Sequence, residues 1–523
     1  MDDTATETHH RVVIVGAGFS GLGAAIRLKR DGVEDFVILE RADDLGGTWR
    51  DNTYPGCACD VPSHLYSFSF APNPDWSRTF SGGGEIWQYL RVTARGHRVE
   101  ERIRYGHEVT GARWDEAAQL WRIETTDGRF TSEFLVAAAG PLADPKLPDI
   151  PGVERFEGRV FHSARWDHEH PLDGERVGVI GTGASSIQLV PAIQPRVGSL
   201  AVFQRTAPWV VGSRDRAISP LERRIYRAAP PAQRLMRAAI YWARELFVLS
   251  FMHPREGSPG ERMARRHLER EVADPALRAR LEPRYRMGCK RVLISDTYYA
   301  ALQAPNVELV TDPIAEITAR GIRTEGGEER ELDTIVLGTG FHVTDKADAT
   351  WVRDAQGRSL EDRWRGSPQA YLGSYVAGFP NLFMMVGPNT GLGHNSIVFM
   401  IESQLNTLID GLRHLDRHGL GVWDVREEVQ ARYNAILQRR LRNTVWNTGG
   451  CQSWYLDRTG RNSSIWPGFT WPFRRRTRHF RPQEFHLAPR RAPAPAPAAA
   501  PAAGGGAGGA GAPRGALVPA EAP

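Results

Sequence analysis

Cysteine is scarce in this chain of 523 residues, which contains only Cys57, Cys59, Cys289 and Cys451. So few cysteines do not suggest a disulfide framework, and we expect a protein of a reducing compartment, the cytoplasm. Cys57 and Cys59 form a CxC pair rather than CxxC, without a matching group of histidines or cysteines. We therefore expect no metal site and assign these two residues no role in the chemistry.

Long apolar runs and an excess of one charge are also missing. The most apolar helical stretch, residues 238–252, is interrupted by Arg244 and Glu245 and is too short to cross a bilayer. The first apolar run ends in glycines, which predicts a strand and no signal peptide. Basic residues number 66 and acidic ones 61, and the charge is spread out apart from the run 474–476. We expect neither membrane insertion nor a nucleic-acid partner.

Two segments follow the order strand, glycine-rich turn, helix, strand. In the first, the strands are Arg11–Gly16 and Phe36–Glu40, and in the second they are Arg176–Gly181 and Leu200–Arg205. Each segment is a βαβ unit, and such units bind dinucleotides. The sequence therefore predicts an α/β fold with two Rossmann-like domains.

The first glycine-rich turn contains Gly16, Gly18 and Gly21 in a GxGxxG pattern. The first glycine allows the tight turn, the second lets the backbone approach a pyrophosphate, and the third lets the helix pack closely on the sheet. Glu40 ends the second strand, where a carboxylate can accept hydrogen bonds from ribose hydroxyls. We assign FAD to this site because of its place in the chain and the motifs that follow it.

The second turn carries a similar set of small residues: Gly181, Thr182, Gly183, Ala184, Ser185 and Ser186. Ser186 takes the third glycine position and is small enough for close packing. The following strand ends in Arg205, with no acid at the ribose position, and Arg can pair with the 2′-phosphate of NADPH. We predict NADPH at this site and hydride transfer to the flavin. The alternative is that Arg205 is only a solvated surface residue.

The remaining pattern predicts how the chain is divided. Strands that end in small residues, at Phe134–Gly140 and Leu332–Gly340, suggest where the chain passes between the two domains, and Asn381–Gly387 suggests its return. The predicted parts are the first part of an FAD-binding domain (1–150), an NADP-binding domain (151–345) with a helical insertion at about 214–286, a return to the FAD-binding domain with a substrate-pocket segment (346–490), and a disordered tail rich in Ala, Pro and Gly (491–523).

Further motifs point to one family. The segment FEGRVFHSARWD matches the pattern FxGxxxHxxxW(P/D) at Phe156, Gly158, His162, Trp166 and Asp167. The other motifs are Gly46-Gly47-Thr48-Trp49, YPGCACD ending at Asp60, Lys290-Arg291 ahead of SDTYY, GTGF at 338–341 and GPN at 387–389. In this combination, residues 10–490 resemble the Baeyer–Villiger monooxygenases, the class B flavoprotein monooxygenases.

The resemblance implies roles for individual residues. Arg291 resembles the family's catalytic arginine, and Asp60 the carboxylate that orients it and tunes the reduced flavin. A permanent guanidinium can stabilise anions without changing its protonation state. The resemblance gives Lys290 a second contact to the 2′-phosphate and leaves His162 either joining the domains or simply filling the core. The other residues that we place at the cofactors are Thr48, Trp49, Tyr66, Val109 and Gln204.

The implied reaction uses FAD, NADPH and O2 to insert one oxygen atom next to a ketone carbonyl through a flavin peroxide, giving an ester or lactone. NADP+ would stay bound and exclude water. The nearest alternative is an N- or S-hydroxylating flavin monooxygenase of the same architecture. A disulfide reductase would need a redox CxxC pair, and a non-catalytic flavin-binding protein would not need Arg291. The sequence does not identify the ketone.

Overall fold

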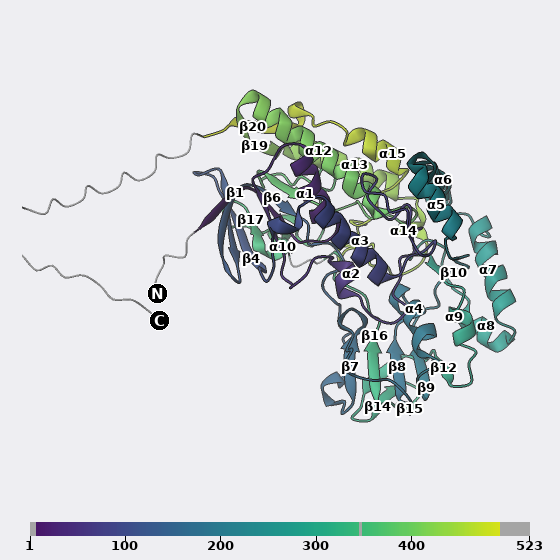
Figure 1. The fold of residues 1–523 in the computed structure, drawn as a ribbon. Helices are drawn as coiled ribbons and strands as arrows, with labels where there is room; N and C mark the ends of the chain where they lie inside the picture. Colours follow the sequence, from purple (N-terminus) through teal and green to yellow (C-terminus); the bar gives the residue numbers. More distant parts are fainter. Residues whose placement is uncertain (1–6, 345–347, 492–523) are drawn as a thin grey trace, which may run out of the picture. The chain divides into compact units, whose positions relative to one another are not determined.

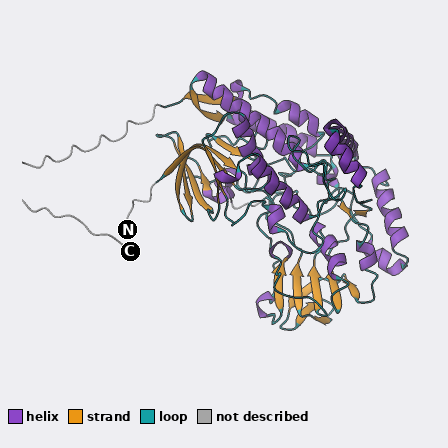
Figure 2. Cartoon of the chain, in the orientation of Figure 1, coloured by secondary structure: helices purple, strands orange, loops and turns teal. Residues whose placement is uncertain are grey.

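The computed structural model describes residues 7–344 and 348–491. From residue 492 onward, the tail that we predict to be disordered lies outside the described residues. The elements before the tail are shown in Figure 1, and their secondary structure in Figure 2.

The first glycine-rich turn belongs to an eight-stranded sheet in the order β17-β4-β5-β6-β1-β2-β3, with β18 also paired to β6. In this sheet β1 lies between β2 and β6 and runs parallel to both, as the pairs Val12↔Phe36 and Val13↔Leu135 show. Strands β4, β5 and β6 form an antiparallel meander. The strands are β1 (Thr8–Val15), β2 (Phe36–Leu39), β3 (Ile103–Arg104), β4 (Val109–Asp115), β5 (Leu120–Thr125), β6 (Gly128–Ala137), β17 (Val352–Arg353) and β18 (Leu382–Met384).

The second turn belongs to a sheet of five parallel strands in the order β12-β9-β8-β16-β7. The strands are β7 (Arg159–His162), β8 (Arg176–Ile180), β9 (Ser199–Phe203), β12 (Val307–Val310) and β16 (Thr334–Leu337). Parallel strands buried on both faces read as continuous apolar runs, and β8 and β16 have that character. The smaller sheets are formed by β10 (Val210–Val211) with β11 (Leu293–Ile294), by β13 (Ile314–Ile317), β14 (Gly321–Thr324) and β15 (Glu329–Glu331), and by β19 (Leu420–Val425) with β20 (Phe485–Pro489).

Helices flank both sheets. In the first part of the fold, α1 packs on β1 and lies beside α12 (Figure 1). The helices are α1 (Phe19–Arg30), α2 (Thr48–Asp51), α3 (Gly83–Gly96), α4 (Ala184–Ile193), α5 (Pro220–Ala228), α6 (Pro230–Met252), α7 (Pro259–Glu271), α8 (Pro275–Leu281), α9 (Tyr298–Ala301), α10 (Asp348–Trp351), α11 (Leu360–Trp364), α12 (Ile397–His418), α13 (Glu427–Leu441), α14 (Val445–Thr448) and α15 (Thr470–Arg476). Within the described residues, no helix is both long enough and apolar enough to cross a bilayer.

Two sheets built around βαβ units confirm the predicted fold class. The helices α5–α8 fall within the segment that we interpret as a helical insertion. The exact domain boundaries stay a prediction.

Close packing of α1 on β1 depends on glycine. Gly16 has φ +101°, and a Cβ there would lie 2.8 Å from the carbonyl oxygen of Ala138. A Cβ on Gly21, in the first turn of α1, would lie 1.8 Å from the carbonyl oxygen of Gly16. A side chain at position 21 would therefore push α1 away from the strand that precedes it.

We expect Gly21→Ala to lower the free energy of unfolding by about 3 kcal/mol or more, because backbone atoms must move to admit the methyl group. The matched control is Gly84→Ala in α3, where a Cβ would meet no atom within 4 Å. Alanine there should be neutral or stabilise by about 0.4–1 kcal/mol. Chemical unfolding followed by circular dichroism measures both changes. Equal stability of the two variants would contradict the packing argument.

Candidate active site

The first glycine-rich turn is tied to the end of β2 by Glu40. This carboxylate is buried, accepts hydrogen bonds from the N–H of Ala17 (2.8 Å) and of Ala42 (3.1 Å), and pairs with Arg50 at 2.9 Å. A carboxylate has about four acceptor positions, so capacity remains for one further donor. Gly18 at the start of α1 has no close neighbour for a Cβ except Gly47 at 3.7 Å. The turn therefore presents open backbone to a ligand.

Aromatic side chains pack next to this turn. The indole N–H of Trp49 donates to the hydroxyl of Tyr66 at 3.2 Å, and the ring of Tyr66 meets Phe19 edge-on at 5.2 Å. Thr48 precedes Trp49 at the start of α2. Val109 is buried at the start of β4, two residues after His107, which hydrogen-bonds the end of β2. Trp49 and Tyr66 thus lie beside the turn, and the start of β4 lies near the end of β2.

The second turn has the same geometry. Gly181 has φ +113°, and a Cβ there would lie 2.5 Å from the carbonyl oxygen of Gly338, whereas a Cβ on Gly183 would meet no atom within 4 Å. Ser186 is fully buried, and a Cβ on Gly338 would lie 2.1 Å from its hydroxyl oxygen. Ser186 therefore fills the close contact between α4 and the GTGF segment, while Gly183, Ala184 and the start of α4 stay accessible.

Two cations come together near the end of β9. Arg205 is exposed and makes no hydrogen bond or ion pair through its side chain within the described part of the chain. Burial and the nearby charge of Arg205 lower the pKa of Lys290, whose ammonium lies 5.4 Å from the ring centre of Tyr285. Gln204 is buried and donates to the carbonyl oxygen of Arg280 at 2.8 Å. Lys290 and Arg205 lie 85 positions apart in the sequence, and the fold brings their charges close.

Arg291 and Asp60 form a two-point ion pair. The Nη2 of Arg291 donates to one carboxylate oxygen of Asp60 at 2.6 Å, and Nε donates to the other. Burial alone would raise the pKa of Asp60, but the charge and hydrogen bonds of Arg291 hold it below its usual value. Burial alone would lower the pKa of Arg291, and Asp60 instead raises it. The Nη1 of Arg291 also donates to the carbonyl oxygen of Leu392 at 3.4 Å.

Residues that we did not single out hold this pair in place. Gln188 on α4 accepts hydrogen bonds from the hydroxyl of Tyr54 (2.9 Å) and the N–H of Ala58 (3.2 Å) and donates to the carbonyl of Ala58 (2.9 Å). It thereby fixes the YPGCAC loop, which ends next to Asp60, on the helix of the second turn. No sequence motif marks a glutamine for this role, because the contact joins segments 130 residues apart.

A second guanidinium lies near the pair. Arg244 on α6 interacts electrostatically with Asp60 and Arg291. Its Nε donates to the carbonyl oxygen of His394 at 3.0 Å, two residues after the Leu392 carbonyl that Arg291 contacts. The sequence suggested only that Arg244 interrupts an apolar stretch. In the structure, this arginine brings the predicted insertion to the site.

The FxGxxxHxxxW(P/D) segment packs within the second sheet. A Cβ on Gly158 would lie 2.2 Å from the carbonyl oxygen of Asp333, and Phe156 packs on the core of this sheet. His162 is buried, contacts Phe341 of the GTGF segment, and has its pKa lowered by burial. Trp166 meets Phe161 edge-on, and Asp167 accepts a turn hydrogen bond from the N–H of Glu169. These contacts are structural, and they place GTGF next to the second turn.

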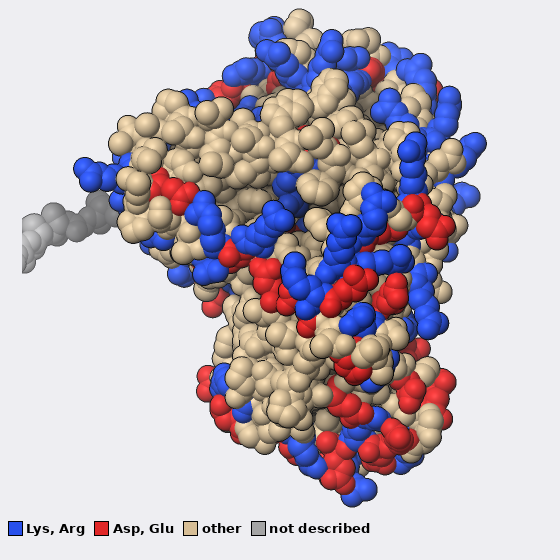
Figure 3. All heavy atoms as spheres, turned by 90° about the vertical axis from the view of Figure 1, so that its right-hand side faces the viewer, with Lys and Arg blue, Asp and Glu red and all other residues tan. Residues whose placement is uncertain are grey.

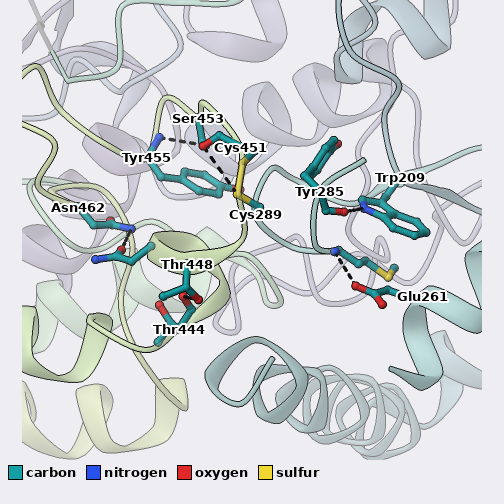
Figure 4. Close-up of a disulfide and its surroundings, with 12 residues drawn as sticks. Trp209, Glu261, Tyr285, Cys289, Thr444, Thr448, Cys451, Ser453, Tyr455 and Asn462 are labelled. Carbon is teal, nitrogen blue, oxygen red and sulfur yellow. Dashed lines mark hydrogen bonds between the residues drawn. A yellow bond between two sulfur atoms is a disulfide. The ribbon is translucent and has the colours of Figure 1, made fainter. Parts of the chain in front are cut away.

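We expected no disulfide framework from so few cysteines. The structure contains a disulfide between Cys289 and Cys451, with Cα atoms 6.1 Å apart (Figure 4). Cys289 directly precedes Lys290 and Arg291, and the neighbouring Tyr455 is fully buried next to the disulfide (Figure 4). A spacing of 162 residues carries no local signal of pairing, because only the tertiary fold brings the two segments together.

Cys57 and Cys59 are free, as expected of a pair without CxxC spacing. Burial raises the pKa of Cys57 to about 11 and that of Cys59 further. Both thiols are therefore protonated at neutral pH and are poor nucleophiles. This argues against a disulfide reductase that uses these residues.

Comparison with known proteins identifies the family. A Baeyer-Villiger monooxygenase of Streptomyces coelicolor is 52% identical over 92% of this chain and 93% of its own length. A Baeyer-Villiger monooxygenase of Pseudomonas aeruginosa is 48% identical over 92% of both chains. The chain belongs to the Baeyer–Villiger monooxygenase family. It is therefore an enzyme, an oxidoreductase, and the family predicted from its motifs is confirmed.

Solved structures of this family have the same fold. A closed crystal structure of cyclohexanone monooxygenase superposes with a TM-score of 0.82 at 28% identity, covering 92% of this chain and all of that one. An oxidised steroid monooxygenase bound to NADP gives 0.82 at 30% identity with coverage of 92% and 100%. The family model for pyridine nucleotide-disulphide oxidoreductases matches residues 13–228, which include both glycine-rich turns. The roles of the individual site residues stay predictions.

We expect Cys451→Ser to lower the free energy of unfolding by about 2–5 kcal/mol, because the disulfide closes a long loop in the unfolded chain. Thermal unfolding without reductant measures the change. Cys57→Ser, which removes a free thiol, is the matched control and should change stability little. If a dithiol reductant leaves the unfolding of the unsubstituted protein unchanged, the disulfide does not stabilise the fold.

Proposed function

We propose that the protein is an FAD-dependent monooxygenase that consumes NADPH and O2 and inserts one oxygen atom next to a ketone carbonyl, giving an ester or lactone. The ion pair between Arg291 and Asp60 is the observation that carries the proposal. Bound FAD would accept a hydride and activate O2. The surrounding residues bind and orient the two nucleotides and the substrate.

The two glycine-rich turns fit the two nucleotides. At Gly18 and Gly183, space is open where a Cβ would project, so a pyrophosphate can approach the backbone and the helix N-terminus behind it. The free capacity of Glu40 suits a ribose hydroxyl. Arg205 and Lys290 together suit a 2′-phosphate, since a phosphate would neutralise two cations that otherwise repel one another.

Arg291 is suited to the oxygen-insertion step because it carries a permanent charge. Negative charge develops on the carbonyl oxygen when oxygen adds to a ketone, and a fixed guanidinium stabilises that charge without moving a proton. Asp60 holds the guanidinium by hydrogen bonds to Nε and Nη2. The third nitrogen, Nη1, points toward the carbonyl oxygen of Leu392. Hydroxylation of nitrogen or sulfur does not pass through an anionic carbonyl adduct, so this arrangement favours the ketone reaction.

Replacing Arg291 tests the proposal directly. We expect Arg291→Ala to retain FAD and to oxidise NADPH, with hydrogen peroxide as the product, while ester formation falls by about 100-fold or more. Arg291→Lys keeps the charge but cannot make the two-point contact with Asp60. Its rate of ester formation should therefore lie between that of the alanine variant and that of the unsubstituted protein. Product analysis with a ketone and a thioether, alongside NADPH consumption, measures the outcome. Undiminished ester from the alanine variant would refute the role of Arg291.

A second substitution tests the cofactor choice. We expect Arg205→Ala to raise KM for NADPH by about tenfold or more while leaving KM for NADH unchanged, because only NADPH carries the phosphate. Arg159→Ala, at another exposed arginine of the second sheet, is the control and should change neither value. Steady-state kinetics with both nucleotides gives the answer. An equal rise in KM for NADH would show that Arg205 does not recognise the 2′-phosphate.

A further inference from the structure

The helix α6 buries polar as well as apolar side chains. Val248 and Phe251 belong to a hydrophobic cluster, whereas Gln233 donates to the carbonyl oxygen of Asn73 at 2.6 Å and Glu245 is fully buried. Glu245 accepts hydrogen bonds from Asn395 at 2.6 Å and from the N–H of Thr470 at 2.9 Å. An amphipathic helix of a globular protein normally directs its polar side chains to solvent. Here buried polar side chains help to anchor the helix.

The outward face of α6 is apolar. Trp242 is 55% exposed and Leu246 is 64% exposed, and they lie one turn apart on the same side of the helix. Of the fifteen large hydrophobic side chains that are exposed in the described residues, eight belong to α5 and α6: Leu221, Ile225, Leu235, Met236, Trp242, Leu246, Phe247 and Leu249. Single exposed hydrophobic residues are ordinary, whereas a gathered set marks an interaction surface. We call this set the apolar face.

A basic cavity lies close to α6. Thr470 contacts α6 through Glu245 and the hydroxyl of Tyr241, and the next residue, Trp471, is exposed and lines a cavity of about 490 Å³. The basic residues that line it are five arginines and one histidine, Arg27, Arg413, Arg474, Arg475, Arg478 and His479, against a single acid, Asp410. Trp471 therefore connects the basic cavity to the segment that contacts α6.

Two arginines of this cavity have no charge partner. Arg475 and Arg478 are exposed and make no ion pair within the described part of the chain, whereas Arg413 pairs with Asp31. Near the apolar face, exposed Arg224 and Arg234 are in the same situation. Figure 3 shows Lys and Arg side chains along the upper rim and the right-hand edge of one face of the molecule.

We propose that the apolar face and the basic cavity close to α6 dock on the surface of an anionic phospholipid bilayer. Tryptophan, phenylalanine and leucine side chains enter the boundary between headgroups and acyl chains, and arginines attract the lipid phosphates. The cavity takes a phosphate headgroup. Trp471 then enters the headgroup region of the bilayer, where tryptophan side chains are enriched. A second copy of the chain fits less well, because a two-fold contact would bring unpaired arginines of both copies together.

Flotation of the full-length holoenzyme with lipid vesicles tests the proposal. We expect the protein to float with vesicles of phosphatidylcholine mixed with phosphatidylglycerol, to float far less with phosphatidylcholine alone, and to be released as salt is raised. Failure to float with the anionic vesicles at low salt would overturn it.

Two pairs of substitutions locate the contact. Trp242→Ser with Leu246→Ser should weaken vesicle binding by about tenfold or more, because apolar area leaves the bilayer. The control is Val92→Ser with Leu147→Ser, two similarly exposed hydrophobic residues outside the apolar face.

Arg475→Gln with Arg478→Gln should weaken vesicle binding by about 30-fold and flatten its salt dependence. Its control is Arg104→Gln with Arg159→Gln. Equal losses in a pair and its control would refute the assigned surface.

Two further results would also overturn the proposal. Dimers detected by sedimentation that disappear with Trp242→Ser and Leu246→Ser would identify a second copy as the occupant. Binding of inorganic phosphate that depends on Arg475 and Arg478, without vesicle binding, would make the cavity a site for soluble anions. The rate of NADPH oxidation and the unfolding temperature should be unchanged in every variant, because none of these residues lies in the candidate active site. These two measurements also verify that each variant is folded.

Discussion

The ion pair between Arg291 and Asp60 depends on two segments that are held independently. Taking a charge out of water is costly unless its partner and its hydrogen bonds are in place. The segments that carry the two side chains must therefore be held in position. On the Asp60 side, Gln188 and the backbone of Ser81 hold the YPGCAC loop. On the Arg291 side, the N–H of Leu293 bonds the carbonyl of Trp209, and Cys289 is joined to Cys451. Displacement of either segment would leave a half-buried charge without its partner.

Much of the fold could be predicted because its signals are local. A strand followed by Gly16 or Gly181 implies a turn with positive φ, and the structure has φ +101° and φ +113° there. The strand expected at Asn381–Gly387 contains β18, Leu382–Met384. The short apolar strands could be placed to within a few residues because turn residues bound them. Ser186, which we expected to allow close packing because it is small, lies against Gly338 in the structure.

The contacts that assemble the site could not be predicted from the sequence. Gln188, Arg244 and the disulfide all act between segments more than a hundred residues apart, where spacing carries no information. The apolar stretch at residues 238–252 could be recognised as helical. Periodicity does not show which of the apolar side chains of such a helix stay exposed. The inward side holds both apolar Val248 and the carboxylate of Glu245, whose partners Asn395 and Thr470 lie 150 and 225 residues further along the chain.

The disulfide also changes how the chain is connected. Cys289 and Cys451 close a covalent ring that contains β16, β18, α12 and α13. A protease that cut once inside this ring would produce two fragments that migrate as a single species until a reductant separates them. Arg291 would then remain linked through sulfur to the C-terminal fragment as well as through the backbone to the N-terminal one. A nick that divides the polypeptide would thus leave the segments around Arg291 covalently tethered.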